Sequence, residues 1–244
     1  MSSTPADAGR VFRPRLWPTI ATLAGLAVLL SLGTWQLQRM GWKRDLIAHA
    51  ETQLAAAPTP LPAGDLAGLD YRRISAVGHY LHDRAFAFGF FAENGRPGGR
   101  LITPFALADG RVILVDRGWM PEDLLPPNVP PGLEPAGTVA LAGIGRWRGD
   151  VRRGWLSPDD TPDLRRWYTW DVPGMARAVA LSLESLELIL ERSEGPAGLP
   201  KAEPVTVAFP NDHLSYAFTW YGLALVLLAV YILFSSTKPG VRQP

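Results

Sequence analysis

Two long stretches without a charged side chain, one near each end of the chain, constrain most strongly how it can fold. The first covers residues 16–38 and the second residues 214–237. As a helix, each is long enough to cross a hydrocarbon core of about 30 Å. Aromatic residues typical of membrane interfaces stand at their edges, including Trp17 and Trp35 in the first stretch. The sequence therefore predicts two transmembrane helices.

The basic residues before the first stretch leave open a second interpretation, a cleaved signal peptide. Arg10, Arg13 and Arg15 would form its basic region. The apolar part, however, is longer than the roughly 7 to 15 residues of a signal peptide, and no typical cleavage site follows it. We therefore favour an uncleaved membrane anchor, which we expect to continue as an amphipathic helix until Pro58 stops it.

The charges at the two ends predict the orientation of the helices, because short cytoplasmic segments are rich in Lys and Arg. Arg13 and Arg15 precede the first helix, and Lys238 and Arg242 follow the second. We expect both termini in the cytoplasm and the middle of the chain in the periplasm. The N-terminal segment contains Asp7 and lacks the composition of a mitochondrial presequence, which favours a bacterial plasma (inner) membrane.

This arrangement argues against two classes of membrane protein. The tails are too short to form a cytoplasmic output domain, as a two-helix receptor would need. The helices lack the intramembrane charges that mark a transport pathway. The predicted parts are a cytoplasmic tail (1–15), a transmembrane helix (16–38), a periplasmic domain (39–212), a second transmembrane helix (213–237) and a cytoplasmic tail (238–244).

The middle of the chain is predicted to be mainly antiparallel β with minor helix, as a small sandwich or an open barrel. Alternation with a period of two favours strands at Arg73–Tyr80 and Arg84–Phe91, the latter followed by a turn. A tight turn between residues 101–107 and 112–115 is typical of a hairpin. Asp171 is expected to cap a short helix at Pro173–Ala180. Further candidate strands cover residues 138–144, 166–170, 186–191 and 205–209.

The composition and the missing motifs exclude several functions. The chain has no cysteine, which removes disulfides, thiolate metal sites and thiol catalysis. A net charge of +1 gives no field that would gather a nucleic acid. No phosphate-binding loop, nucleophile elbow or zinc-protease motif is present, so the sequence does not predict an enzyme.

His213 is the most informative of the four histidines, because it stands at the outer boundary of the second helix. His213, Tyr216 and Trp220 follow the spacing i, i+3, i+7 and share one helix face. An imidazole above two rings at the membrane edge can ligate the iron of a haem. The alternative is an ordinary set of interfacial anchors.

Polar residues stand at the same boundary of the first helix. Gln36, Arg39 and Lys43 share a face and offer hydrogen-bond donors and positive charge, which suit haem propionates. The alternative is basic side chains that extend from a helix end toward water. In the middle domain, Arg117 and Trp119 at a strand end suit a contact with a partner protein better than catalysis.

Four separated blocks of sequence carry a resemblance to a known family. They are Gly33–Lys43, Gly78–Asp83, the pair Thr103–Pro104 with Arg117–Pro121, and the pattern of Asn211, His213, Tyr216, Ala217 and Trp220. In this order and topology the chain resembles the Surfeit-locus family of cytochrome c oxidase assembly factors. Asp116 and Asp212 depart from the pattern, in which Asn is expected.

The resemblance implies a non-enzymatic factor that helps to insert haem a into the main subunit of cytochrome c oxidase, or to stabilise it there. It implies transient binding of haem a, with His213 as the ligand of the iron and the main oxidase subunit, other assembly factors and the lipid bilayer as partners. One alternative is a scaffold that binds the oxidase subunit without haem, with Arg117 and Trp119 as contacts. Another is a membrane-anchored periplasmic enzyme. The residues expected around the haem are Gln36, Arg39, Tyr216 and Trp220.

Overall fold

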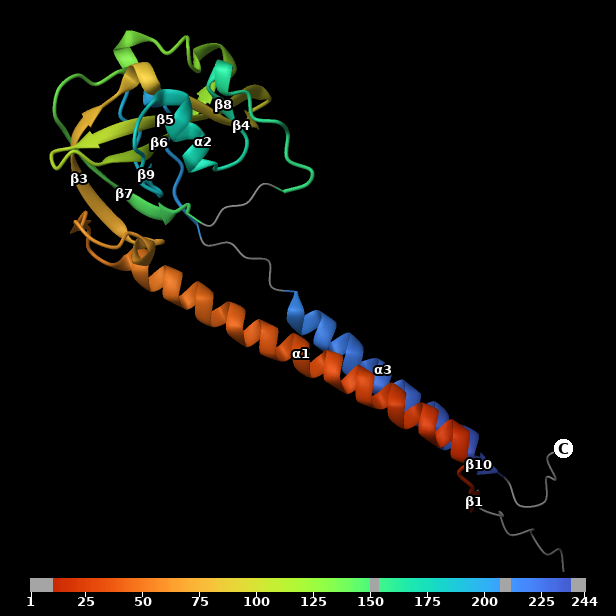
Figure 1. The fold of residues 1–244 in the computed structure, drawn as a ribbon. Helices are drawn as coiled ribbons and strands as arrows, with labels where there is room; N and C mark the ends of the chain where they lie inside the picture. Colours follow the sequence, from red (N-terminus) through yellow and green to blue (C-terminus); the bar gives the residue numbers. More distant parts are fainter. Residues whose placement is uncertain (1–10, 150–153, 207–211, 238–244) are drawn as a thin grey trace, which may run out of the picture. The chain divides into compact units, whose positions relative to one another are not determined.

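The computed structural model describes residues 11–149, 154–206 and 212–237 (Figure 1). The chain divides into two compact units. One comprises Met1–Ile47 with Ala208–Pro244, and the other comprises Ala48–Val207. The first unit contains the helix pair up to residue 47, and the second contains the end of the first helix and the β domain. Asn211 of the boundary pattern and the charged residues Arg10, Lys238 and Arg242 lie outside the described residues.

The two apolar stretches form the helices α1 (Leu16–Ala55) and α3 (His213–Ser235), both long and apolar enough to cross a membrane. The predicted transmembrane helices are thereby confirmed. As predicted, α1 continues without a break past residue 38, and it ends three residues before Pro58. At one end of the helix pair the short strands β1 (Val11–Phe12) and β10 (Ser236–Thr237) pair antiparallel.

The helices α1 and α3 lie side by side and run in opposite directions (Figure 1). Near one end the hydroxyl groups of Thr19 and Tyr231 are 2.6 Å apart, and further along those of Thr34 and Tyr221 are 3.2 Å apart. Such hydrogen bonds between side chains, together with close packing, hold helices together where lipid removes the hydrophobic drive.

Small residues let the two helices approach closely. A Cβ atom on Gly33 would lie 2.9 Å from the ring of Tyr221, and one on Gly25 would lie 2.9 Å from Cδ2 of Leu227. On α3 the buried residue Ala217 contributes no more than a methyl group to the interface. Side-chain atoms of α3 therefore fill the space that a side chain at Gly25 or Gly33 would need.

Five strands of the β domain close into a barrel in the order β3-β7-β9-β6-β5, with β5 returning to β3 (Figure 1). Neighbouring pairs in this ring are antiparallel except β6 with β9. The mainly antiparallel domain is thus confirmed, and of the two expected forms the barrel is the one observed, although it is closed rather than open. The barrel strands are β3 (Arg73–Tyr80), β5 (Arg96–Leu107), β6 (Val112–Pro121), β7 (Val139–Trp147) and β9 (Leu186–Leu190).

Shorter elements extend this barrel. They are β2 (Thr59–Pro60) beside β3, and β4 (Phe86–Glu93) with β8 (Arg166–Trp167) beyond β5. Short 3₁₀ turns occupy the connections at Ala67–Leu69, His82–Arg84, Glu122–Leu124, Pro131–Leu133, Pro162–Leu164 and Pro196–Gly198.

Residues at every second position of the strands form the barrel core, as the period of two requires. Ile74 and Phe105 are among the fully buried side chains of this core. A second apolar cluster, which includes Ile102 and Leu114, packs under the helix α2 (Val172–Val179). The carboxylate of Asp171 accepts a hydrogen bond of 2.9 Å from the Gly174 amide, so the predicted cap is confirmed.

Most predicted strands are present, with shifted ends. β3 has the predicted bounds, and the hairpin of β5 and β6 is longer than expected. The turn after β4 uses only Asn94 and Gly95, both with positive φ, which suits a tight hairpin turn. Val205 and Thr206 are not in a strand, and the rest of that predicted strand, residues 207–209, lies outside the described residues.

Candidate functional site

His213 and Gln36 meet in the helix pair, as their expected position at one boundary required. Nδ1 of His213, the first residue of α3, lies 2.8 Å from Oε1 of Gln36 on α1. With the amide oxygen as acceptor, Nδ1 carries the proton and Nε2 keeps its lone pair. Within the described residues Nε2 has no hydrogen-bond partner. Metal-binding histidines commonly have one ring nitrogen fixed by a neighbouring acceptor in this way.

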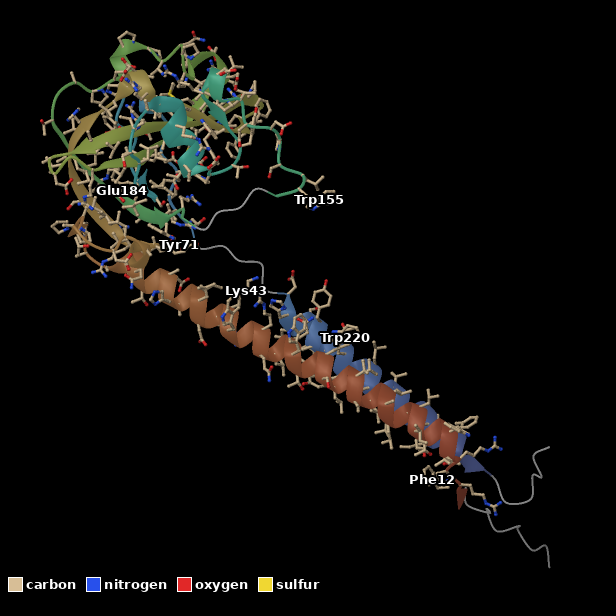
Figure 2. All side chains as sticks on the ribbon, in the orientation of Figure 1. Phe12, Lys43, Tyr71, Trp155, Glu184 and Trp220 are labelled. Atoms are coloured by element: carbon tan, nitrogen blue, oxygen red, sulfur yellow. The ribbon has the colours of Figure 1, made fainter. Side chains whose placement is uncertain are left out.

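Tyr216 and Trp220 follow His213 on α3. The side chain of Tyr216 is exposed. Trp220, labelled in Figure 2, is half-buried, and its indole N–H is shielded from solvent without an acceptor in the described part of the chain. An unpaired N–H group in an apolar environment costs about 1 to 3 kcal/mol. The indole N–H of Trp220 is therefore a donor on this helix face for which the described residues supply no acceptor.

Arg39 lies one turn from Gln36 on α1. Its guanidinium carbon lies 4.0 Å from the ring centroid of Trp42, a cation–π contact that holds the exposed arginine on the helix. No hydrogen bond joins Arg39, Tyr216 or Trp220 to His213 within the described residues. The structure thus brings Gln36 into direct contact with His213 and places the other three on the same two helices.

Arg117 and Trp119 occupy the interior of the β domain, with only 1% and 8% of their surface exposed. The Arg117 guanidinium lies over the ring of Tyr80, and its Nε donates to Glu194 at 3.0 Å. The Trp119 indole donates to the Phe91 carbonyl at 3.1 Å. The expectation of an exposed contact is therefore corrected: both side chains are buried and are held by contacts within the domain.

A buried charge cluster on the outer side of the barrel was missed by the sequence reasoning. Asp116 and Glu187 are almost fully buried, and each pairs with an arginine, Asp116 with Arg100 and Glu187 with Arg148. Desolvation by burial raises the pKa of Glu187 to about 8, while the nearby guanidinium of Arg148 opposes the shift. These four side chains and others line a hollow of about 270 Å³.

One signal in the sequence marks this cluster. Glu187 stands inside the apolar run Leu186–Leu190, where a lone charge predicts a buried partner. Asp116, which departs from the expected Asn, also accepts a hydrogen bond of 2.9 Å from the Gly118 amide. Both carboxylates are engaged, and no group of His, Asp and Glu side chains in the described ranges is arranged to hold a metal ion. The cluster is structural.

Comparison with known proteins agrees with this architecture. The model of the SURF1 family matches residues 23–225, which include most of both helices and the whole β domain. A SURF1-like protein of Monosiga brevicollis is 34% identical over 92% of this chain and 91% of its own length. Surfeit locus protein 1 of Xenopus tropicalis is 32% identical over 79% of this chain and 67% of its own length. The corresponding mouse protein is 33% identical over 81% and 69%. A match that runs from one membrane helix through the barrel to the other shows that the chain belongs to the SURF1 family.

Proposed function

We propose that this chain is a membrane-bound, non-enzymatic assembly factor for cytochrome c oxidase that acts on the main oxidase subunit. Membership of the SURF1 family supports this role. The two apolar helices suit a factor that meets a membrane-embedded client. In the described residues the buried carboxylates are held in ion pairs, and His82 is engaged with the Pro135 carbonyl. These contacts leave no acid–base constellation that favours an enzyme.

We further propose that the factor holds haem a transiently, with His213 as the ligand of the iron. The contact between His213 and Gln36 carries this proposal, because it occupies Nδ1 and leaves Nε2 without a hydrogen-bond partner among the described residues. When bound, haem supplies an iron that accepts an imidazole nitrogen. Gln36 fixes the tautomer and the orientation of the ring.

The neighbouring residues support the same ligand class. The exposed guanidinium of Arg39 can pair with a propionate carboxylate. The rings of Tyr216 and Trp220 offer apolar surface on the helix that carries His213. The indole N–H of Trp220, which has no acceptor among the described residues, adds a hydrogen-bond donor on this helix.

An absorption spectrum of the purified protein tests the haem proposal. Protein from a host that makes haem a should carry a haem spectrum, and His213→Ala should lose it. His49→Ala is the matched control, because His49 is an exposed histidine on α1. A wild-type protein without haem, or a His213→Ala variant that retains it, would overturn haem binding. Co-purification of the main oxidase subunit by such a protein would leave a scaffold role in place.

We also propose a bacterial plasma membrane as the location, with both termini in the cytoplasm and the β domain in the periplasm. The basic residues at the two ends of the chain support this orientation. The chain has no cysteine, so His79→Cys introduces a single thiol at an exposed position of β3. A membrane-impermeant maleimide should label it in intact spheroplasts. Labelling only after lysis would reverse the orientation.

A further inference from the structure

Strand β7 is paired on both sides along only part of its length. On one side, Val139–Ile144 pair with β3. On the other side, β9 pairs only with Gly143–Trp147, because it ends at Leu190 opposite Gly143. Residues 139–142 therefore have a strand neighbour on one side and form an open edge of the barrel wall.

Hydrogen bonds near the other end of β7 show which amides face this edge. The Gly145 amide donates to the Arg72 carbonyl on the β3 side, and the Arg148 amide donates to the Ser185 carbonyl on the β9 side, each at 2.8 Å. Successive residues of an antiparallel strand alternate in the direction of their backbone bonds. The amides of Ala140 and Ala142 therefore point to the β9 side, where the described residues provide no partner.

A hollow of about 680 Å³ lies along the open edge. Ala140 and Ala142 line one wall, and residues 190–194 line the other. Both alanines are exposed, and their methyl groups let another backbone approach the strand closely. Unpaired amides beside such a hollow are a template for one more strand.

The charges around the hollow indicate which side chains an incoming strand should carry. Arg73 pairs with Glu191 at 2.9 Å, and Glu194 is held by the buried Arg117. Arg192 is exposed and forms no ion pair with any described residue. An acidic side chain on an incoming strand would complement the Arg192 guanidinium.

We propose that the edge 139–142 binds an extended, acidic segment of a partner polypeptide by strand addition. The hollow between the edge and the wall 190–194 is bounded on both sides, so it suits one extended segment. A second copy of the barrel would bring its own flanking wall and could not pair edge to edge. The choice of partner rests on the proposed function, in which the segment belongs to the main oxidase subunit.

Hydrogen exchange of the full chain in detergent, with and without the main oxidase subunit, tests this inference directly. The amides of Ala140 and Ala142 should exchange rapidly in the free protein and become at least about tenfold slower in the complex. The Leu141 amide, which points to β3, is an internal control and should stay slow in both. A complex in which Ala140 and Ala142 gain no protection overturns the inference.

Two substitutions test it by co-purification. Ala142→Pro removes an amide that faces only the edge, which a strand tolerates. Arg192→Glu reverses the proposed charge contact. Each should lower recovery of the main oxidase subunit about tenfold, equivalent to about 1.4 kcal/mol. Arg177→Glu, at an exposed site on α2, should change nothing.

The outcomes separate the two proposals. Equal recovery with wild-type protein and Arg192→Glu overturns strand addition and leaves the assembly role intact. Failure of wild-type protein to recover the subunit overturns both the strand addition and its proposed partner. If Ala142→Pro fails to fold, the exchange data on the wild type and the Arg192→Glu variant still decide the question.

Discussion

Nδ1 of His213 lies 2.8 Å from Oε1 of Gln36, a residue 177 positions away in the sequence. The contact joins the first residue of α3 to the middle of α1. It exists because the helices are antiparallel and in one register, in which Tyr221, about two turns further along α3, meets Thr34. A ring held by one nitrogen presents the other in a defined direction.

We predict that Gln36→Leu weakens haem binding while His213 remains in place. Loss of a partner that orients a metal-bound histidine typically costs 10-fold to 100-fold in affinity, so a rise of about this size in the haem dissociation constant is expected. Titration of the apo-protein with haem measures it. Gln38→Leu, at an exposed position two residues away, is the control. Equal affinity of both variants and wild type would remove Gln36 from the site.

We predict that Gly33→Leu separates the helix pair. A Cβ atom at this position already lies 2.9 Å from the Tyr221 ring, and a larger side chain forces the helices apart. The expected loss is about 1 to 3 kcal/mol of unfolding free energy in detergent. Gly41→Leu on the same helix has open space and should be neutral or stabilising. Similar losses for both variants would contradict this packing.

We predict that Glu187 lowers the stability of the β domain as pH rises. The pKa of Glu187 is about 8 in the folded protein against an ordinary value of 4.5, so the folded state binds this proton more tightly than the unfolded state. Its contribution is fully present below pH 4.5 and is lost as pH rises through about 8.

Urea unfolding at a series of pH values between 4.5 and 8 measures this effect. In Glu187→Gln the unfolding free energy should decrease less with pH over this range than in the wild type. Glu184→Gln, three residues away, is the control and should keep the wild-type slope. A Glu187→Gln variant with the same slope as wild type would show that the Arg148 pair keeps the carboxylate charged throughout.

We predict that Gly118→Ala destabilises the domain by about 3 kcal/mol, because it combines two costs. Gly118 has φ of +114°, and a Cβ atom there would lie 2.2 Å from the Lys201 carbonyl oxygen. Gly110→Ala separates the two costs, since Gly110 has φ of +84° but open space around it. That variant should lose only about 1 kcal/mol in thermal or urea unfolding. Equal losses of unfolding free energy in the two variants would mean that backbone strain alone accounts for the cost of Gly118→Ala.

The helices and most strands were predictable because their signals are local. Long stretches without charged residues predict α1 and α3, and the alternation of inward-facing and outward-facing residues predicts β3. The closure of the barrel was not predictable in this way, because the pairing of β3 with β5 joins residues distant in sequence. The proximity of Gln36 to His213 was predictable from their equal depth, while their hydrogen bond depends on the register of two helices.

Arg117 shows why one site prediction failed. Arginine is usually exposed, so an Arg-Gly-Trp segment at a strand end favours a surface. The period of two, however, places Arg117 on the same face as Ile113 and Val115, inside the barrel. The carboxylate of Glu194 that makes this burial tolerable comes from a loop 77 positions later.

The paired hydroxyl groups of the helix pair have one further consequence. A slide of α1 along α3 by one turn, about 5.4 Å, would break the Thr19–Tyr231 and Thr34–Tyr221 pairs together and press a side chain onto the slot above Gly33. Intermediate positions satisfy neither pair. The two helices therefore have one favoured register, and that register fixes which residues of α1 the His213 imidazole can reach.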